Sequence, residues 1–172
     1  MTYHPGGSAK AISGSSQMQA DSMKAALDVL RRYTRELPPV AAIQARVTAY
    51  DGHRLVLTAP LSANVNDKGS AFGGSMSSLM TYAGWGLVTL QLQQAAMTAD
   101  VFVADSSVRY LKPLYADLHA EAELAPDQSW PTFLQTLAQR GRARIHLRAR
   151  ILLPDGQVMA DLAGRYVAIA KG

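Results

Sequence analysis

One segment restricts the possible folds of this chain more than any other: a helical stretch from about residue 75 to residue 95. Its apolar side chains fall on nearly every side of an α-helix, and such a helix is stable only when it is buried on most sides. They are Met76, Leu79, Met80, Ala83, Leu87, Val88 and Leu90. Gly84 and Gly86 lie among them and destabilise a helix by on the order of 1 kcal/mol each relative to Ala. Their presence indicates that another segment or subunit approaches the helix closely.

The segments before and after this helix are typical of β-strands. Residues 43–49 and 55–59 alternate apolar and polar side chains on either side of a tight Asp-Gly turn. Four further strand-like segments follow the helix, at 100–111, 115–124, 141–153 and 157–170. The segment "DQSWPTFLQTLAQR" fits either a short helix or a loop. This order predicts an α+β fold in which a curved, mostly antiparallel sheet wraps around the long central helix.

The N-terminal part of the chain divides at about residue 20. Residues 1–19 are rich in Gly, Ser and Ala without periodicity, which predicts a disordered tail. Apolar residues then recur at helical spacing over residues 20–37, with Asp21 or Ser22 as the N-cap and a Pro-Pro pair after the last turn. Since there are no repeats, we expect a single domain over residues 20–172.

Composition excludes several classes of function. The chain has no cysteine, which excludes disulfides, thiolate metal sites and cysteine nucleophiles. Its four histidines lack metal-ligand spacing, so we expect no metal and no cofactor. No apolar run is long enough to span a bilayer and the N-terminus lacks a secretory signal, so we expect a cytoplasmic protein without membrane contact. The formal net charge of +4 gives a mild preference for anionic partners.

The loop that leads into the central helix, "NVNDKGSAFGGS", carries the strongest indication of chemistry. A Gly73-Gly74 pair before a helix leaves backbone N–H groups unpaired at the positive end of the helix dipole. Such groups can bind a phosphate or polarise a carbonyl oxygen, and Gly73 is the leading donor. Asn66 could position a water molecule or a substrate carbonyl. The alternatives are a flexible connection at the glycines and a plain turn residue at Asn66, like Asn64 and Asp67.

A semi-polar stripe continues from that loop along the central helix. Ser77, Thr81 and Trp85 follow one another at a spacing of four residues, so they lie on one face that begins at the glycine end. A group held at the helix N-terminus would lie along this stripe. The alternative is that these hydroxyls bond back to carbonyls of the preceding turn, as they commonly do in buried helices.

Basic residues are concentrated on one face of the strand "GRARIHLRARILL". The strict alternation predicts an apolar face toward the helix and an outward face made of Arg142, Arg144, His146, Arg148 and Arg150. The outward face is either solvated surface or an anion-binding stripe, and Arg109 and Lys112 add a second basic pair. Aromatic residues do not interleave with these arginines, which argues against nucleic acid as a partner.

Three segments together resemble the hot-dog fold, in which a curved antiparallel sheet wraps a long central helix. They are "NDKGSAFGGSMSSLMTYAG", "SSVRYLKPL" and "GRARIHLRARILLPDGQVMADLAGRYVAI", within roughly residues 40–170. More narrowly, "APLSANVNDKGSAFGGS" followed by "AGWG" resembles the bacterial thioesterase domain of the YiiD C-terminal type. The resemblance implies hydrolysis of an acyl thioester of coenzyme A or acyl carrier protein, with coenzyme A only as part of the substrate. It also implies a homodimer, or a tetramer, with sites at subunit interfaces.

The resemblance also suggests site residues. In many related thioesterases a loop Asn or Gln, a His-Gly-Gly sequence and a helical Asp or Glu do the work. By position, the loop amide falls on Asn66 and the carbonyl-polarising N–H on Gly73, while Phe72 replaces the histidine and Thr81 the carboxylate. Phe72 argues against the dehydratase chemistry of this fold. The missing carboxylate leaves no obvious general base, for which Asp67 or Asp105 could substitute.

Three functional hypotheses are compatible with these residues. The first is an acyl thioesterase in which Asn66, Gly73 and Thr81 are catalytic. Its substrate-binding residues would be Asp67, Phe72, Gly74, Ser77, Trp85, Arg109 and Lys112. The alternative is a non-catalytic acyl-CoA- or acyl-carrier-binding protein, which the missing carboxylate favours. A purely structural homo-oligomer is a third reading.

Overall fold

The computed structural model describes residues 9–171, with side chains from residue 16 onward. The helices are α1 (Ala9–Glu36), α2 (Pro38–Ala42), α3 (Gly73–Gln94) and α4 (Trp130–Arg140), with a short 3-10 helix at Leu61–Ala63. The strands are β1 (Arg46–Tyr50), β2 (Arg54–Ala59), β3 (Ala99–Tyr110), β4 (Leu118–Leu124), β5 (Arg142–Leu152) and β6 (Val158–Ala170).

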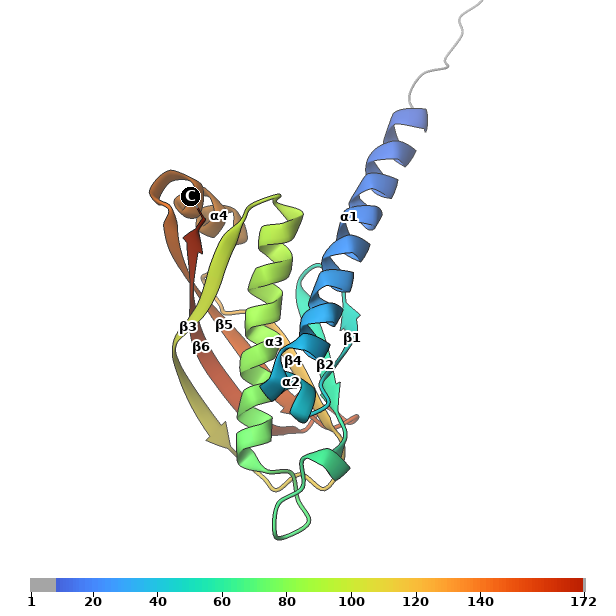
Figure 1. The fold of residues 1–172 in the computed structure, drawn as a ribbon, viewed down its shortest axis with the longest axis vertical. Helices are drawn as coiled ribbons and strands as arrows, with labels where there is room; N and C mark the ends of the chain where they lie inside the picture. The colour runs from blue at the N-terminus through green and yellow to red at the C-terminus, as the bar shows by residue number, and fades with distance from the viewer. Residues whose placement is uncertain (1–8, 172) are drawn as a thin grey trace, which may run out of the picture.

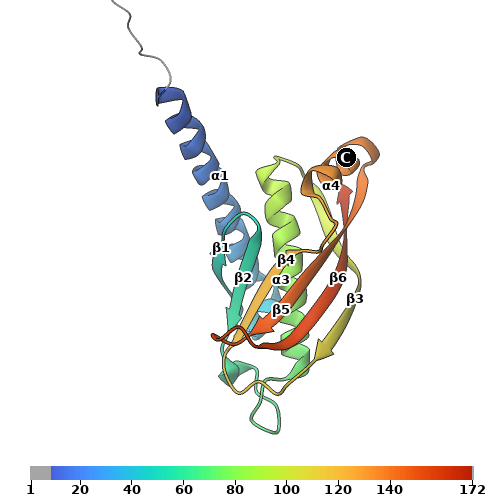
Figure 2. The same ribbon diagram turned by 180° about the vertical axis from the view of Figure 1, so that it is seen from behind.

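The strands form one antiparallel sheet in the order β1-β2-β4-β5-β6-β3. This sheet curves around α3, which contacts β2, β3, β4, β5 and β6 (Figures 1 and 2). The apolar residues of α3 are buried on most sides, and α1 packs against the helix where the sheet does not reach. The predicted α+β arrangement, a curved antiparallel sheet around a long central helix, is confirmed.

The two glycines inside α3 are explained by close neighbours. A Cβ atom at Gly84 would overlap the ring and hydroxyl of the fully buried Tyr166, whose hydroxyl donates a hydrogen bond of 3.0 Å to the Thr81 carbonyl. A Cβ atom at Gly86 would lie 2.9 Å from a methyl group of Leu55. Both glycines therefore allow the sheet to approach the helix, as the sequence predicted.

α1 begins earlier than the sequence predicted. The helix runs from Ala9 without a break through Asp21 and Ser22, so neither residue is its N-cap. The prediction of a disordered tail over residues 1–19 is therefore wrong from residue 9 onward, while residues 1–8 lie outside the described residues. Gly and Ser weaken a helix by no more than about 1 kcal/mol each, and the Ala, Lys, Gln and Met residues between them are good helix formers. Figure 1 shows the first turns of α1 projecting beyond the body of the protein.

Three further details differ from the pattern of the sequence. β1 begins only at Arg46, and its pairing with β2 is irregular between Val47 and Ala49, so the alternation predicted from residue 43 is interrupted. The Pro-Pro pair ends α1 but also opens α2, because proline is tolerated in a first helical turn. The undecided segment forms α4, capped by the Ser129 side chain and ended by Gly141 at φ 67.

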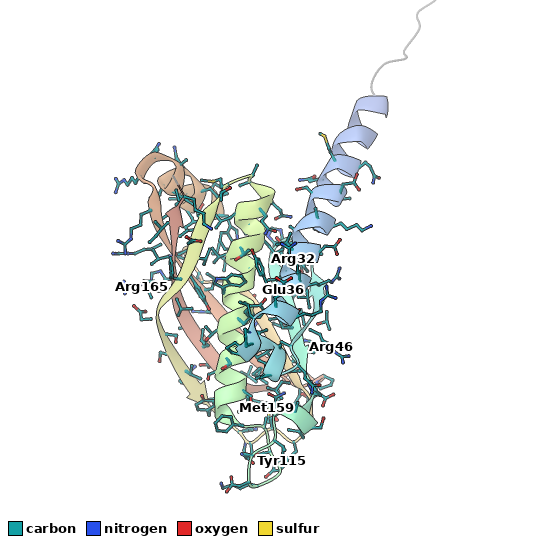
Figure 3. All side chains as sticks on the ribbon, viewed as in Figure 1. Arg32, Glu36, Arg46, Tyr115, Met159 and Arg165 are labelled. Carbon is teal, nitrogen blue, oxygen red and sulfur yellow. The ribbon has the colours of Figure 1, made fainter. Side chains whose placement is uncertain are left out.

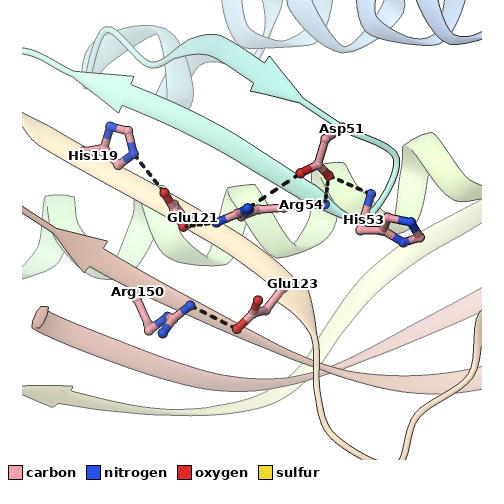
Figure 4. A network of polar contacts seen from close by, with 7 residues as sticks. All are labelled: Asp51, His53, Arg54, His119, Glu121, Glu123 and Arg150. Carbon is pink, nitrogen blue, oxygen red and sulfur yellow. Dashed lines mark hydrogen bonds and ion pairs between the residues drawn. The ribbon is translucent and has the colours of Figure 1, made fainter. Parts of the chain in front are cut away.

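The outer face of the sheet carries a network of ion pairs. β5 alternates as predicted, with its apolar residues buried and its basic residues directed outward. Arg150 lies 3.0 Å from the Glu123 carboxylate, and Arg54 lies 3.2 Å from Glu121 (Figure 4). Because Arg54, Arg150 and Glu123 are open to solvent, these pairs contribute little to the stability of the fold.

Candidate active site

The loop before α3 is held in place by a buried asparagine. Asn64 is 3% exposed, and its Nδ2 donates to the carbonyls of Ile43 (2.9 Å) and Pro60 (2.8 Å). The backbone carbonyl of Asn64 accepts a hydrogen bond of 2.7 Å from the Phe72 N–H, which closes the loop at the start of α3. Asn64 is therefore the residue that fixes the path of the loop, a role that its Asn-rich sequence context did not distinguish from that of a turn residue.

Asn66 directs its side chain into its own turn. Its Oδ1 accepts the N–H groups of Lys68 (2.9 Å) and Ser70 (3.1 Å), and its Nδ2 donates to the Ser70 hydroxyl at 3.0 Å. Both ends of the amide thus have partners within the loop. In this conformation Asn66 shapes the loop.

The first turn of α3 presents free backbone donors. Gly73 is its first residue, and among residues 9–171 the N–H of Gly73 has no hydrogen-bond partner and no side chain caps the helix. The preceding Phe72 is extended, with φ −66 and ψ 129, and its ring is 56% exposed beside Gly74. This turn therefore combines unpaired N–H groups with the positive end of the helix dipole, which suits an oxygen that gains negative charge.

Tyr110 of β3 lies against this turn and was not identified from the sequence. Its hydroxyl donates to the Gly73 carbonyl at 3.0 Å, and its ring lies 3.3 Å from the place where a Cβ atom of Gly73 would be. The alternation of β3 could have indicated it, since Tyr110 pairs with the buried Ala160 and so faces inward. Met159 and Tyr115, labelled in Figure 3, lie at this same end of the molecule.

The stripe along α3 remains partly open in the protomer. Ser77, Thr81, Trp85 and Thr89 are half-buried, whereas most other residues of the helix are buried. The Ser77 hydroxyl donates back to the Gly74 carbonyl at 3.0 Å, as the structural alternative predicted. In contrast, the Thr81 hydroxyl has no hydrogen-bond partner among residues 16–171. Thr81 is therefore free to bind a water molecule or a substrate.

Trp85 connects α3 to the neighbouring strand. Its indole N–H donates to the Val101 carbonyl of β3 at 3.0 Å, and its ring stacks on Tyr82 with centroids 5.3 Å apart. Tyr33 of α1 meets the same ring edge-on at 5.7 Å. Trp85 is thus fixed by contacts from three elements.

Three of the predicted substrate-binding residues lie away from the stripe. Asp67 is exposed in the loop and pairs with Lys68 at 2.8 Å. Arg109 lies on the outer face of the sheet and binds Asp161 through two hydrogen bonds of 2.9 and 2.6 Å. Lys112 is exposed just after β3, at the end of the sheet where α3 begins. The other predicted residues follow α3 from its first turn over about 18 Å, and they are Phe72, Gly73, Gly74, Ser77, Thr81 and Trp85.

Asp105 and Asp67, the possible substitutes for the missing carboxylate, are both engaged elsewhere. Asp105 forms an ion pair with Arg165 on the outer face, and the α3 sequence itself contains no Asp, Glu or His. Within residues 9–171 no group of three or more His, Asp or Glu side chains could hold a metal ion. None of the helices described is long and apolar enough to cross a membrane.

The curved antiparallel sheet wrapped around a long central helix defines a hot-dog fold. Solved structures share this fold. A protein of unknown function from Chlorobaculum tepidum is 28% identical, with a TM-score of 0.78 over 84% of this chain and 94% of its own. A putative thioesterase from Shewanella oneidensis is 29% identical, with a TM-score of 0.74 over 85% of this chain and 99% of its own. A thioesterase from Haemophilus influenzae, 14% identical, shares the fold with a TM-score of 0.65 over 84% of this chain and 90% of its own.

The chain belongs to the family described as "Putative thioesterase (yiiD_Cterm)", whose model matches residues 27–170. The match includes the loop before α3, the whole of α3 and every strand of the sheet. Family and fold together support a thioesterase-type function.

Proposed function

We propose that this protein hydrolyses acyl thioesters carried on coenzyme A or acyl carrier protein. The observation that carries the proposal is the first turn of α3, where the N–H of Gly73 has no partner among residues 9–171 and no side chain caps the helix. Family membership supports the same chemistry. A thioester carbonyl at this turn would be polarised by the N–H groups and by the helix dipole, and both would stabilise the oxyanion of the transition state.

The remaining residues of the site have supporting roles in this proposal. A water molecule held at the first turn of α3 attacks the thioester carbon with its oxygen, while Thr81, about 12 Å further along the helix, does not touch the reacting carbon. The carbon–sulfur bond then breaks, and the departing thiolate takes a proton from the attacking water, which yields the free acid and the thiol. Asn66 acts as a positioning residue because its amide holds the loop that precedes Gly73. Lys112 attracts the phosphates of the carrier.

The proposal includes a homodimer formed through β3. This strand is an edge of the sheet, and it exposes Phe102, Val103 and Tyr110, with exposed fractions of 53%, 40% and 53%. A long edge strand with apolar side chains is a template for pairing with another chain. Pairing with β3 of a second copy would extend the sheet and cover the stripe on α3, so the site would lie at the subunit interface.

The test is the release of free thiol from a panel of acyl-CoA and acyl-carrier substrates of graded chain length. We expect turnover with at least part of the panel. Absence of thiol release from every substrate of the panel would reject the proposal.

The absence of an acidic residue on α3 favours one second candidate, a non-catalytic acyl-CoA- or acyl-carrier-binding protein. Tight binding of these thioesters without release of thiol from any of them would reject hydrolysis and support this alternative.

A further inference from the structure

A hollow of about 500 Å³ lies where α1, α2 and the start of β1 meet. Three arginines line it: Arg31 and Arg35 come from α1, and Arg46, labelled in Figure 3, opens β1. Among the described residues, no Asp or Glu shares this lining. We call it the arginine hollow, and it lies beside the edge of the sheet that is opposite β3.

The packing of α1 places its two arginines at this hollow. Leu30 and Thr34 are buried on the side of α1 that faces the body of the protein. Arg31 and Arg35 each follow one of these buried residues, and they stand one helical turn apart on the same flank of the helix. Since α1 also contacts β1, the side chains of both elements border one space.

The positive charge of the arginine hollow is only partly balanced within the chain. Arg31 has an acidic partner, Asp28, at 3.2 Å. Arg35 and Arg46 form no ion pair and no side-chain hydrogen bond with any of residues 16–171. The carbonyl end of α1 favours a cation such as Arg35, but it does not account for Arg46, which comes from another element. Because like charges that face one space repel, an anion bound between them would stabilise the arrangement.

The surface between the arginines is suited to more than a bare ion. Ala41, Ala45 and Val47 also line the hollow, and of these Ala45 is buried and Val47 half-buried. Gln44 adds an amide group, and its φ of 55 lies in the left-handed region that residues with a Cβ atom rarely adopt. The volume falls within the range of small-molecule sites. The arginine hollow therefore offers positive charge and apolar surface side by side.

We propose that the arginine hollow binds the phosphate group of a small organic molecule. Guanidinium groups bind phosphate oxygens through paired, charge-assisted hydrogen bonds, and here they approach from two elements. The organic part of the ligand lies over the alanines and Val47. The phosphorylated ribose of coenzyme A has this chemistry, and so does a free sugar phosphate. The proposal does not rest on thioester hydrolysis, and pairing through β3 would leave this edge of the sheet open.

Isothermal titration calorimetry of the full chain tests the site with ribose phosphate, coenzyme A and inorganic phosphate. We expect at least one of the organic phosphates to bind, and to bind more tightly than inorganic phosphate because it also covers apolar surface. Arg35→Gln and Arg46→Gln should each weaken that binding about tenfold, since each removes a charge-assisted hydrogen bond. Arg144→Gln is the matched control. Arg144 is exposed on β5 without an ion partner among residues 16–171, and its loss should leave the affinity unchanged.

Dephospho-coenzyme A, which lacks the phosphate on the ribose, distinguishes the two sources of ligand. If coenzyme A occupies the hollow, removal of this phosphate and Arg46→Gln should each weaken binding, and the two losses should not add because they concern one contact. If Arg46→Gln weakens only the binding of ribose phosphate, the ligand is a free sugar phosphate. Either result supports the arginine hollow as a phosphate site.

No binding of any probe would overturn the proposal, and so would inorganic phosphate that binds as tightly as the organic phosphates. Unchanged affinity in folded Arg35→Gln and Arg46→Gln proteins, or an equal loss in Arg144→Gln, would do the same. Circular dichroism confirms that the variants are folded. Because the heat of binding is measured rather than the release of thiol, the phosphate site and the thioesterase proposal can each fail while the other stands.

Discussion

At the scale of single residues, the contact between Gly84 and Tyr166 fixes how closely the sheet meets α3. Gly84→Ala should destabilise the protein by about 1–3 kcal/mol despite the better helix propensity of Ala, because the added methyl group overlaps the Tyr166 hydroxyl. Urea unfolding monitored by circular dichroism would measure the change. A stability equal to or above that of the unmodified chain would contradict the close contact between Gly84 and Tyr166.

The same pair allows a double-mutant cycle. Tyr166→Phe alone should cost about 1 kcal/mol, since the hydrogen bond to the Thr81 carbonyl is lost. Because the two side chains occupy the same space, the double variant should be more stable than the sum of the single effects predicts. Strict additivity in the cycle would argue against direct contact.

At the scale of elements, the turn between β1 and β2 depends on a carboxylate. The N–H groups of His53 and then Arg54 donate to Asp51 and lower the pKa of this carboxyl below its usual 3.8. A lowered pKa means that the carboxylate contributes stability above the ordinary pKa, and that this contribution is lost as the pH falls through the lowered value.

Asp51→Asn should therefore be less stable than the unmodified chain near neutral pH, and the difference should shrink as the pH falls below about 4. The effect will be modest because the side chain is exposed to solvent. Thermal unfolding of both proteins across this pH range would test it, and a difference that stays constant with pH would contradict the electrostatic explanation.

The elements also show what sequence patterns can and cannot predict. The strict alternation of β5 and the all-round apolar character of α3 depend only on local periodicity, so both elements were predictable. The N-terminal extent of α1 was not predictable, because its Gly- and Ser-rich first turns follow no apolar pattern. At the site, the free N–H of Gly73 could be expected from the Gly-Gly sequence. The side-chain directions of Asn66 and Arg109 could not be predicted. Asn66 meets Ser70 because of the loop geometry, and Arg109 meets Asp161 because of the strand register.

At the scale of the whole molecule, the proposed dimer makes β3 the critical edge. Light scattering should give twice the chain mass of 18.5 kDa. Val103→Asp, which places a charge in the middle of that edge, should shift the protein toward monomer because charged side chains on an edge strand oppose pairing with another chain. Ala49→Asp adds the same charge to β1, the opposite edge, and should leave the mass unchanged. A monomeric unmodified chain, or loss of the dimer in the β1 variant instead, would contradict the proposal.

The central claim is that the backbone N–H of Gly73 polarises the thioester carbonyl, and a pair of substitutions isolates that single group. Gly73→Pro removes the N–H at a position where proline is favoured, since Gly73 opens the helix and Phe72 already has the extended conformation that precedes proline. Gly73→Ala keeps the N–H and introduces a Cβ atom at the same place, facing Tyr110.

The most direct measurement is therefore the ratio of kcat for Gly73→Ala to kcat for Gly73→Pro on the best acyl thioester. Removal of one oxyanion donor lowers kcat by about 10²–10³, so the predicted ratio is of that order, with both proteins folded. Equal kcat values in the two variants would contradict the account.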